Sequence, residues 1–361
     1  MRGSASTSNA GNTVSHTARV AALVLALLCV LAAPSASATE LNAVGERNIE
    51  VARQVLESSR GKTGAFYAAC MDENAVKRVG MAPLKPLLAR IDAIHDRTSL
   101  STTLADLDNV GVQALWLATT EADSHGSPHY IAVIAPNSKD ERYNFLSREQ
   151  LNVLISEIDW DVYFHTRGFS EFTDLNVTDA ADLLSLSERL RAMPLSELKS
   201  LLHERLISAF SSWLPAESGG HPSTIARWRR CVALVDAEMP DALGRAWIAR
   251  AFSPQAKAKA ETMVSAIIAA MRERLRGATW LSDGARAEAL TKLDAMTIAI
   301  GYPDRWDDVD SNVEIDSRSL IADIMHASTA LVAAGVAKLN APLDRRSFDI
   351  SVLAADAYYA P

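Results

Sequence analysis

Apolar residues recur every three or four positions over most of the chain. From Pro254 to Arg276 this spacing predicts one long amphipathic helix. Its expected buried stripe consists of Ala260, Met263, Val264, Ile267, Ile268, Met271 and Leu275. Ser282 is the expected N-cap of a second helix, which Gly301-Tyr302-Pro303 should end. Together the two segments predict a helical hairpin.

Three further stripes of the same period predict helices at Leu183–Leu190, Leu198–Ala209 and Leu320–Val336. Two short apolar runs, 114–118 and 130–135, flank the turn-forming sequence Gly126-Ser127-Pro128 and predict a small β-hairpin. The expected fold class is therefore mainly α, a multi-helix domain with a small β-hairpin.

The first 38 residues have a different pattern. Arg2 and Arg19 precede the apolar run from Val20 to Ala33, and the small residues Ala36-Ser37-Ala38 follow it. This order is typical of a signal peptide, with cleavage expected after Ala38. A helix of that run would cover only about 21 Å of a ~30 Å hydrocarbon core. We therefore expect an exported protein, periplasmic or secreted, with no stable membrane span; the alternative is an uncleaved N-terminal membrane anchor.

Composition narrows the possible partners and crosslinks. The 361 residues carry 36 basic and 44 acidic side chains, a net charge of −8, with no basic stripe interleaved with aromatics. We therefore expect no nucleic-acid partner. Beyond the leader two cysteines remain, Cys70 and Cys231, which in an exported protein form either one disulfide or two buried free thiols.

Residues for catalysis are missing from the sequence. A thermolysin-like zinc site needs two histidines one helical turn apart, with a glutamate beside the first. His203-Glu204 has Ile207 at the position of the second histidine. His125 and His129 are four apart, but glycine and proline between them disfavour a helix. We expect no metal ligand and no catalytic residue in this chain.

Several short blocks occur in an order that is informative. They are Phe66-Tyr67-Ala68-Ala69-Cys70-Met71-Asp72-Glu73, Gly80-Met81-Ala82-Pro83-Leu84, Tyr143-Asn144, Asp159-Trp160, Arg227-Trp228-Arg229-Arg230-Cys231, Phe252-Ser253-Pro254-Gln255, Gly301-Tyr302-Pro303-Asp304-Arg305-Trp306, Pro342-Leu343-Asp344-Arg345 and Asp356-Ala357-Tyr358-Tyr359-Ala360-Pro361. The ordered set resembles the N-terminal lid domain of the neprilysin and endothelin-converting-enzyme family of zinc metallopeptidases.

The resemblance carries implications for the domains and the disulfide. It implies a helical lid-type domain at residues 39–340, followed at 341–361 by the truncated start of a catalytic domain. It also implies a disulfide between Cys70 and Cys231. In the full-length family the cofactor is zinc, and here we expect none in this chain.

The end of the chain is the expected substrate contact. In the family, the residues matched by Asp356 and Ala357 lie on an edge strand that binds the substrate backbone. Here an aspartate replaces the family's asparagine, and an ionised carboxylate accepts hydrogen bonds but cannot donate one. We expect an orphan edge strand that retains little of this contact.

Three functions remain open at this point, the last of them a helical scaffold that neither cleaves nor binds peptides. The first is a truncated member of a family that cleaves peptides, inactive alone because the zinc motif is absent. The second is a non-catalytic helical module that binds peptides, another partner, or a separate catalytic half.

Overall fold

The computed structural model describes residues 38–122, 127–136, 144–169, 171–172, 175–221, 223–348 and 350–357. Residues 1–37 of the expected signal peptide, and His125 of the histidine pair, lie outside this part. The chain divides into two compact units, one containing Pro254–Ile298 and residues up to Glu46, the other Arg47–Ser253 and Ala299–Pro361.

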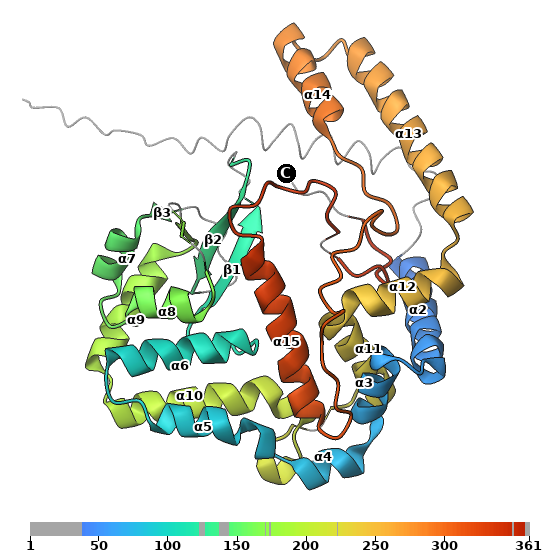
Figure 1. Cartoon of the computed structure of the whole chain (residues 1–361). Helices are drawn as coiled ribbons and strands as arrows, with labels where there is room; N and C mark the ends of the chain where they lie inside the picture. Colours follow the sequence, from blue (N-terminus) through green and yellow to red (C-terminus); the bar gives the residue numbers. More distant parts are fainter. Residues whose placement is uncertain are drawn as a thin grey trace, which may run out of the picture. The chain divides into compact units, whose positions relative to one another are not determined.

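Helices dominate the larger unit, as the hydrophobic periodicity predicts (Figure 1). Its helices are α2 (Ala38–Ser58, which begins in the smaller unit), α3 (Lys62–Met71), α4 (Glu73–Val79), α5 (Lys85–Asp92), α6 (Arg97–Asn109), α7 (Arg148–Leu154), α8 (Trp160–Thr166), α9 (Ala180–Ala192), α10 (Leu195–Phe210), α11 (Arg227–Glu238), α12 (Pro240–Ala251) and α15 (Leu320–Ala337). In the described part of the chain, 3₁₀ turns lie at Ala82–Leu84, Ser211–Trp213 and Ala216–Ser218. The expected mainly-α fold is confirmed.

The predicted β-hairpin is part of a larger sheet. Strands β1 (Leu117–Ala122) and β2 (Tyr130–Ala135) pair antiparallel from Leu117 opposite Ala135 to Ala122 opposite Tyr130. β4 (Leu175–Val177) adds parallel to β2, and β3 (Phe145–Leu146) pairs antiparallel with β4, giving the order β1-β2-β4-β3. Strands of two and three residues carry no readable alternation, so the sequence revealed only the hairpin.

Aromatic side chains fill the core beside this sheet. Trp116, Trp160, Tyr163 and Phe164 are buried, and neighbouring rings lie 5.1–5.5 Å apart between their centroids. Most meet edge-on or tilted, the arrangement that ring quadrupoles favour. This cluster joins α8 to the segment that leads into β1.

Helix α15 runs through the middle of the larger unit and contacts α3, α6, α11 and β1 (Figure 1). Among the described helices it alone is long and apolar enough to cross a membrane. It nevertheless buries Asp323, whose carboxylate accepts backbone hydrogen bonds from Asp316 (2.8 Å) and Ser317 (3.2 Å). A charged group held by protein backbone in this way identifies α15 as a helix of the domain core.

The smaller unit contains the predicted helical hairpin, α13 (Pro254–Gly277) and α14 (Asp283–Ala295). Ser282 caps α14 as expected, accepting a hydrogen bond from the amide of Ala285 at 3.2 Å. The hairpin's own core is small, formed by Met271, Leu275, Ala289 and Leu293.

Two details of this hairpin differ from the sequence expectation. Met263 and Ile267 are 65% and 45% exposed, because α14, with 13 residues, is about half as long as the 24-residue α13 and covers only its C-terminal part. α14 also ends at Ala295, well before Gly301. Gly301 instead occupies a turn at φ +71°.

The expected orphan edge strand at the end of the chain lies partly outside the described residues. Residues 350–357 form no strand, and Tyr358–Pro361 lie outside the described part. Strand-like pairing occurs earlier, where Tyr130 N donates to Ala341 O at 3.0 Å and Leu343 N donates to Pro128 O at 2.9 Å. Residues 341–343 of the tail therefore pair with the backbone at the start of β2. Local sequence cannot indicate such a long-range contact.

Candidate functional site

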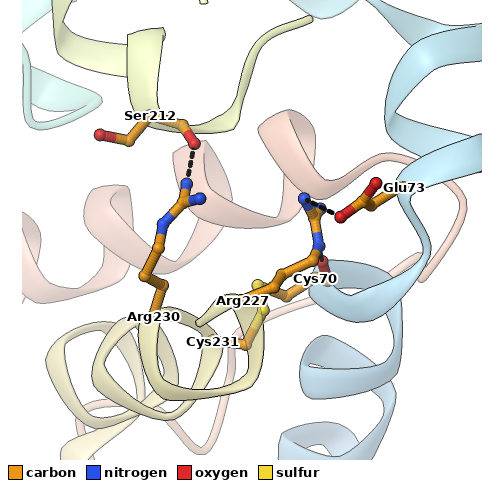
Figure 2. Close-up of a disulfide and its surroundings, with 6 residues drawn as sticks. All are labelled: Cys70, Glu73, Ser212, Arg227, Arg230 and Cys231. Atoms are coloured by element: carbon orange, nitrogen blue, oxygen red, sulfur yellow. Dashed lines mark hydrogen bonds and ion pairs between the residues drawn. A yellow bond between two sulfur atoms is a disulfide. The ribbon is translucent and has the colours of Figure 1, made fainter. Parts of the chain in front are cut away.

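The W-R-R-C block lies at the first turn of α11, directly against the end of α3 (Figure 2). Cys70 and Cys231 form a disulfide whose Cα atoms are 5.7 Å apart, and both side chains are fully buried. The two cysteines are 161 residues apart in sequence. The crosslink therefore joins two helices, α3 and α11, that are far apart in the sequence.

Arginines of the same block secure its surroundings. Arg227 donates from Nε to the carbonyl of Cys70 at 2.7 Å and lies 3.5 Å from the Glu73 carboxylate. Burial lowers the pKa of Arg227, and the Glu73 charge opposes that effect. Arg230 donates to the carbonyl of Ser212 (Figure 2). These contacts go to backbone and to a structural ion pair, so this block has a structural role.

Stacking explains why tryptophan occurs in this block. Two guanidinium groups lie over the ring of Trp228, Arg53 at 5.1 Å and Arg229 at 4.6 Å from its centroid. Arg53 in turn bonds the carboxylate of Glu50. The stack ties α2 to α11, as cation–π contacts of partly buried arginines commonly do.

The Phe66-to-Glu73 block is likewise built for packing and capping. Phe66 and Tyr67 are buried, and the Asp72 carboxylate accepts from the amide of Ala75 at 2.9 Å, which caps α4. The resemblance in this block therefore falls on residues that hold α3 and α4 in place.

The two residues of the expected substrate contact lie at the end of the described part of the chain. Asp356 and Ala357 are both exposed, and the carboxylate of Asp356 accepts from the amide of Ala357 at 2.8 Å. The aspartate thus bonds its own neighbour, a local arrangement that short acidic side chains favour. A role for the two residues in binding a peptide backbone stays a prediction.

The histidines lie apart from one another in the described part of the chain. His203 Nε2 lies 3.2 Å from the Asp92 carboxylate, and His129 forms a β-bridge with Pro342. No group of three or more His, Cys, Asp or Glu that could hold a metal ion occurs among the described residues. The arrangement does not fit the three or four ligands that a zinc site needs.

The Gly301-to-Trp306 block packs against α12 and the residue that follows it in the larger unit. The Tyr302 ring meets Phe252 edge-on at 5.8 Å, and Trp306 packs over Gly244 of α12 with the Arg245 guanidinium 5.4 Å from its ring. A Cβ atom on Gly301 would lie 2.5 Å from the Phe252 ring. Both the contact and the positive φ require glycine here.

Gly301→Ala is expected to lower the free energy of unfolding by about 2–3 kcal/mol, because left-handed backbone costs an alanine about 1–2 kcal/mol and the Phe252 ring must also move. Urea unfolding followed by tryptophan fluorescence measures the change. Gly284→Ala is the matched control, since it lies in α14 with open space around it. A loss at Gly301 no larger than at Gly284 would contradict this account.

Sequence reasoning missed several carboxyls that are buried or half-buried, among them Asp108, Asp236 and Glu238. Asp108 accepts from the hydroxyl of Tyr163, and that hydroxyl accepts from Trp116 Nε1 at 2.9 Å. Near the end of α11, Asp236 accepts from Ser351 at 2.7 Å and Glu238 accepts from Ser328 at 2.9 Å. Burial raises the pKa of Asp108 and of Glu238 to about 7 each. Their sequence neighbours are ordinary helix residues, so no local signal marks them.

Comparison with known proteins decides the family. The N-terminal model described as "Peptidase family M13" matches residues 31–139 and 135–303. The chain belongs to peptidase family M13. The match covers both disulfide cysteines, α11 and the helical hairpin, and the expected family resemblance is confirmed.

Curated relatives of this M13 chain are much longer. A neutral endopeptidase of Lactococcus lactis is 34% identical over 110 residues, covering 30% of this chain and 18% of the relative. Mouse endothelin-converting enzyme-like 1 is 24% identical over 241 residues, covering 61% and 31%. Neprilysin-11 of Caenorhabditis elegans is 23% identical over 257 residues, covering 62% and 30%. This M13 chain thus matches less than a third of each relative's length.

Solved structures show the same fold. The open state of the Mycobacterium tuberculosis zinc metalloprotease Zmp1 superposes with a TM-score of 0.79 at 22% identity, covering 95% of this M13 chain and 67% of that one. PepO of Lactobacillus rhamnosis superposes with a TM-score of 0.65 at 14% identity, covering 92% and 67%. At these identities the likeness concerns the fold of the M13 chain.

Proposed function

We propose that this chain is the lid-type N-terminal part of a zinc-dependent M13 peptidase and does not hydrolyse peptides by itself. The observation that carries the proposal is the family match over residues 31–303 in a sequence that contains no H-E-x-x-H. A lid-type domain contributes walls that enclose a peptide, while the ion and its ligands come from a catalytic half.

The residues present support this division of labour. Zinc hydrolysis needs a metal with an open coordination position and a base next to it. His203 has Glu204 beside it but Ile207 one turn later, and the described residues offer no alternative ligand set.

Purified protein is therefore expected to show no zinc-dependent cleavage of a fluorogenic peptide library above a heat-treated control. The same assay with chelator present gives the background rate. Peptide cleavage that depends on added zinc, and that a chelator abolishes, would contradict the proposal. Reading the genomic DNA after codon 361 for an H-E-x-x-H separates a chain that continues into a catalytic half from a short non-catalytic protein.

A second candidate is a peptide-binding or partner-binding helical module. The exposed C-terminal residues Asp356 and Ala357 support it, since their sequence resembles the family's backbone-binding strand. Calorimetry against a mixed peptide pool tests it, and the double variant Asp356→Ala with Ala357→Pro should lose any heat observed. Heat that this variant retains would place binding elsewhere.

Export belongs to the same proposal. The leader of residues 1–38 and the buried Cys70–Cys231 disulfide both suit an oxidising compartment. Mass spectrometry of the N-terminus of protein made in cells would test it, with Thr39 as the expected first residue. An intact leader in the membrane fraction would favour the anchor instead.

A further inference from the structure

Two carboxyls near the end of α11 are placed where ionisation is costly. Asp236 and Glu238 both lie in the last turn of that helix, and each is largely buried. The described residues give neither one an ion-pair partner, and each has a single serine hydroxyl as its side-chain partner. One hydroxyl replaces only part of the hydration that a carboxylate loses on burial.

Each carboxyl touches a different part of the chain. Glu238 bonds Ser328 in the middle of α15. Asp236 bonds Ser351, whose hydroxyl also accepts from the amide of Leu353 at 3.0 Å. Leu353 is buried, and its carbonyl accepts from Asn48 Nδ2 at 2.9 Å. The last turn of α11 therefore contacts both α15 and the tail segment 350–357 through these two carboxyls.

Charged groups on the neighbouring elements are directed elsewhere. On α3, Lys62 donates to the carbonyl of Ser311. On α12, Asp241 accepts from the amide of Asp308, and Arg245 pairs with the Asp308 carboxylate. On α15, Asp323 accepts from the amides of Asp316 and Ser317, and His326 contacts the carbonyl of Glu314. Arg47 of α2, Arg250 of α12, and Arg345 and Arg346 of the tail are exposed. Nothing in this set neutralises a negative charge at Asp236 or Glu238.

We propose that the last turn of α11 is a proton-operated latch: protonated Asp236 and Glu238 hold α15 and segment 350–357 against α11, and ionised they loosen both. Ionisation admits water to the two contacts because the closed interface offers each charge only one hydrogen bond. The segment lies within residues 341–361, which resemble the start of the family's catalytic domain, so a role in movement between halves rests on the proposed function.

Proton linkage sets the size of the effect. Burial raises the pKa of Glu238 to about 7 and also raises that of Asp236, while in an opened interface both return toward their ordinary values. Between those values the closed state holds a proton that the open state has lost. Each pH unit then raises the equilibrium constant for local opening by up to about tenfold per group. For Glu238 the total increase is about 300-fold between pH 4.5 and 7.

Hydrogen exchange with mass spectrometry tests the latch in the full chain with its disulfide intact. After correction for the intrinsic exchange rate, peptides from 320–337 should lose at least about tenfold more protection between pH 5.5 and pH 8 than peptides from α10. Peptides from 350–357 should also lose more protection than peptides from α10 over the same range. Equal changes in all three regions, or no change, would overturn the proposal. The readout does not require peptidase activity, so it stands apart from the proposed function.

Variants separate the two carboxyls from general effects of pH. Asp236→Asn should flatten the pH dependence of 350–357, and Glu238→Gln that of 320–337, because an amide still accepts from serine but does not titrate. Glu217→Gln, at an exposed position, is the control and should behave like the native protein. A pH dependence that the double variant retains would overturn the latch.

A milder variant guards against failure to fold. Ser328→Ala removes the hydroxyl that favours the ionised form of Glu238, so loss of protection in 320–337 should continue to higher pH than in the native protein. An unchanged profile in this variant would also count against the latch.

Discussion

Replacing both disulfide cysteines, Cys70→Ala with Cys231→Ala, is expected to lower the free energy of unfolding by about 3–5 kcal/mol. The crosslink closes a loop across 161 residues, and on the chain-entropy account a loop of that length is worth about 5 kcal/mol. The expected loss is somewhat smaller than that value, because residual structure in the unfolded chain reduces the entropy that the crosslink removes. Urea unfolding of native and variant protein, without reductant, measures the difference.

The control for this prediction lies on the same helix. Ala233 is exposed on α11, and Ala233→Ser should change stability by no more than about 0.5 kcal/mol. Native protein that is unfolded, fully reduced and then allowed to refold in reductant should match the double variant. A double variant within about 1 kcal/mol of the native protein would show that the α3–α11 contact is held by packing and by Arg227.

Asp108→Asn is expected to make the protein more stable at pH 8, by about 2–4 kcal/mol, and to remove much of its dependence on pH. Burial raises the pKa of Asp108 to about 7, against an ordinary 3.8 in the unfolded chain. The hydrogen bond from Tyr163 and the charge of Arg167 reduce this shift without abolishing it. An asparagine keeps an oxygen that can accept from Tyr163 and carries no charge to bury.

The sign of the effect follows from which state binds the proton. Below pH 3.8 both states are protonated, and stability from this group is at its maximum. From there to about pH 7 the folded state alone keeps the proton, so stability falls by about 1.4 kcal/mol for each pH unit, and above pH 7 it falls no further. The gain in the variant should therefore grow across that window and then become constant.

Chemical denaturation at pH 4, 6 and 8 measures this profile. Asp161→Asn is a surface control, since its side chain is 75% exposed. Tyr163→Phe should keep the aromatic packing but leave Asp108 and Trp116 Nε1 without their shared partner, so it should be destabilising. An Asp108→Asn protein that is less stable at every pH, with the native slope, would contradict the role assigned to burial.

Local sequence determined the elements whose signals lie within a single segment. Periodic stripes located α13, α14, α9, α10 and α15, and Ser282 marked a helix start, because amphipathic spacing and capping act over one or two turns. The ordered blocks also indicated the family, and with it the pairing of Cys70 and Cys231. Most of these blocks prove to be caps, stacks and turns, such as Asp72, Trp228 and Gly301.

Only the tertiary structure decided which charged groups are buried and what the tail contacts. Asp108, Asp236 and Glu238 resemble any solvated helix residue in sequence, and their burial depends on partners 55 to 115 residues away. The addition of β4 to β2, and the docking of Leu343 beside Pro128, are long-range pairings of the same kind. The physical reason is that desolvation and strand pairing depend on which segments the whole chain brings together, and local patterns carry no record of it.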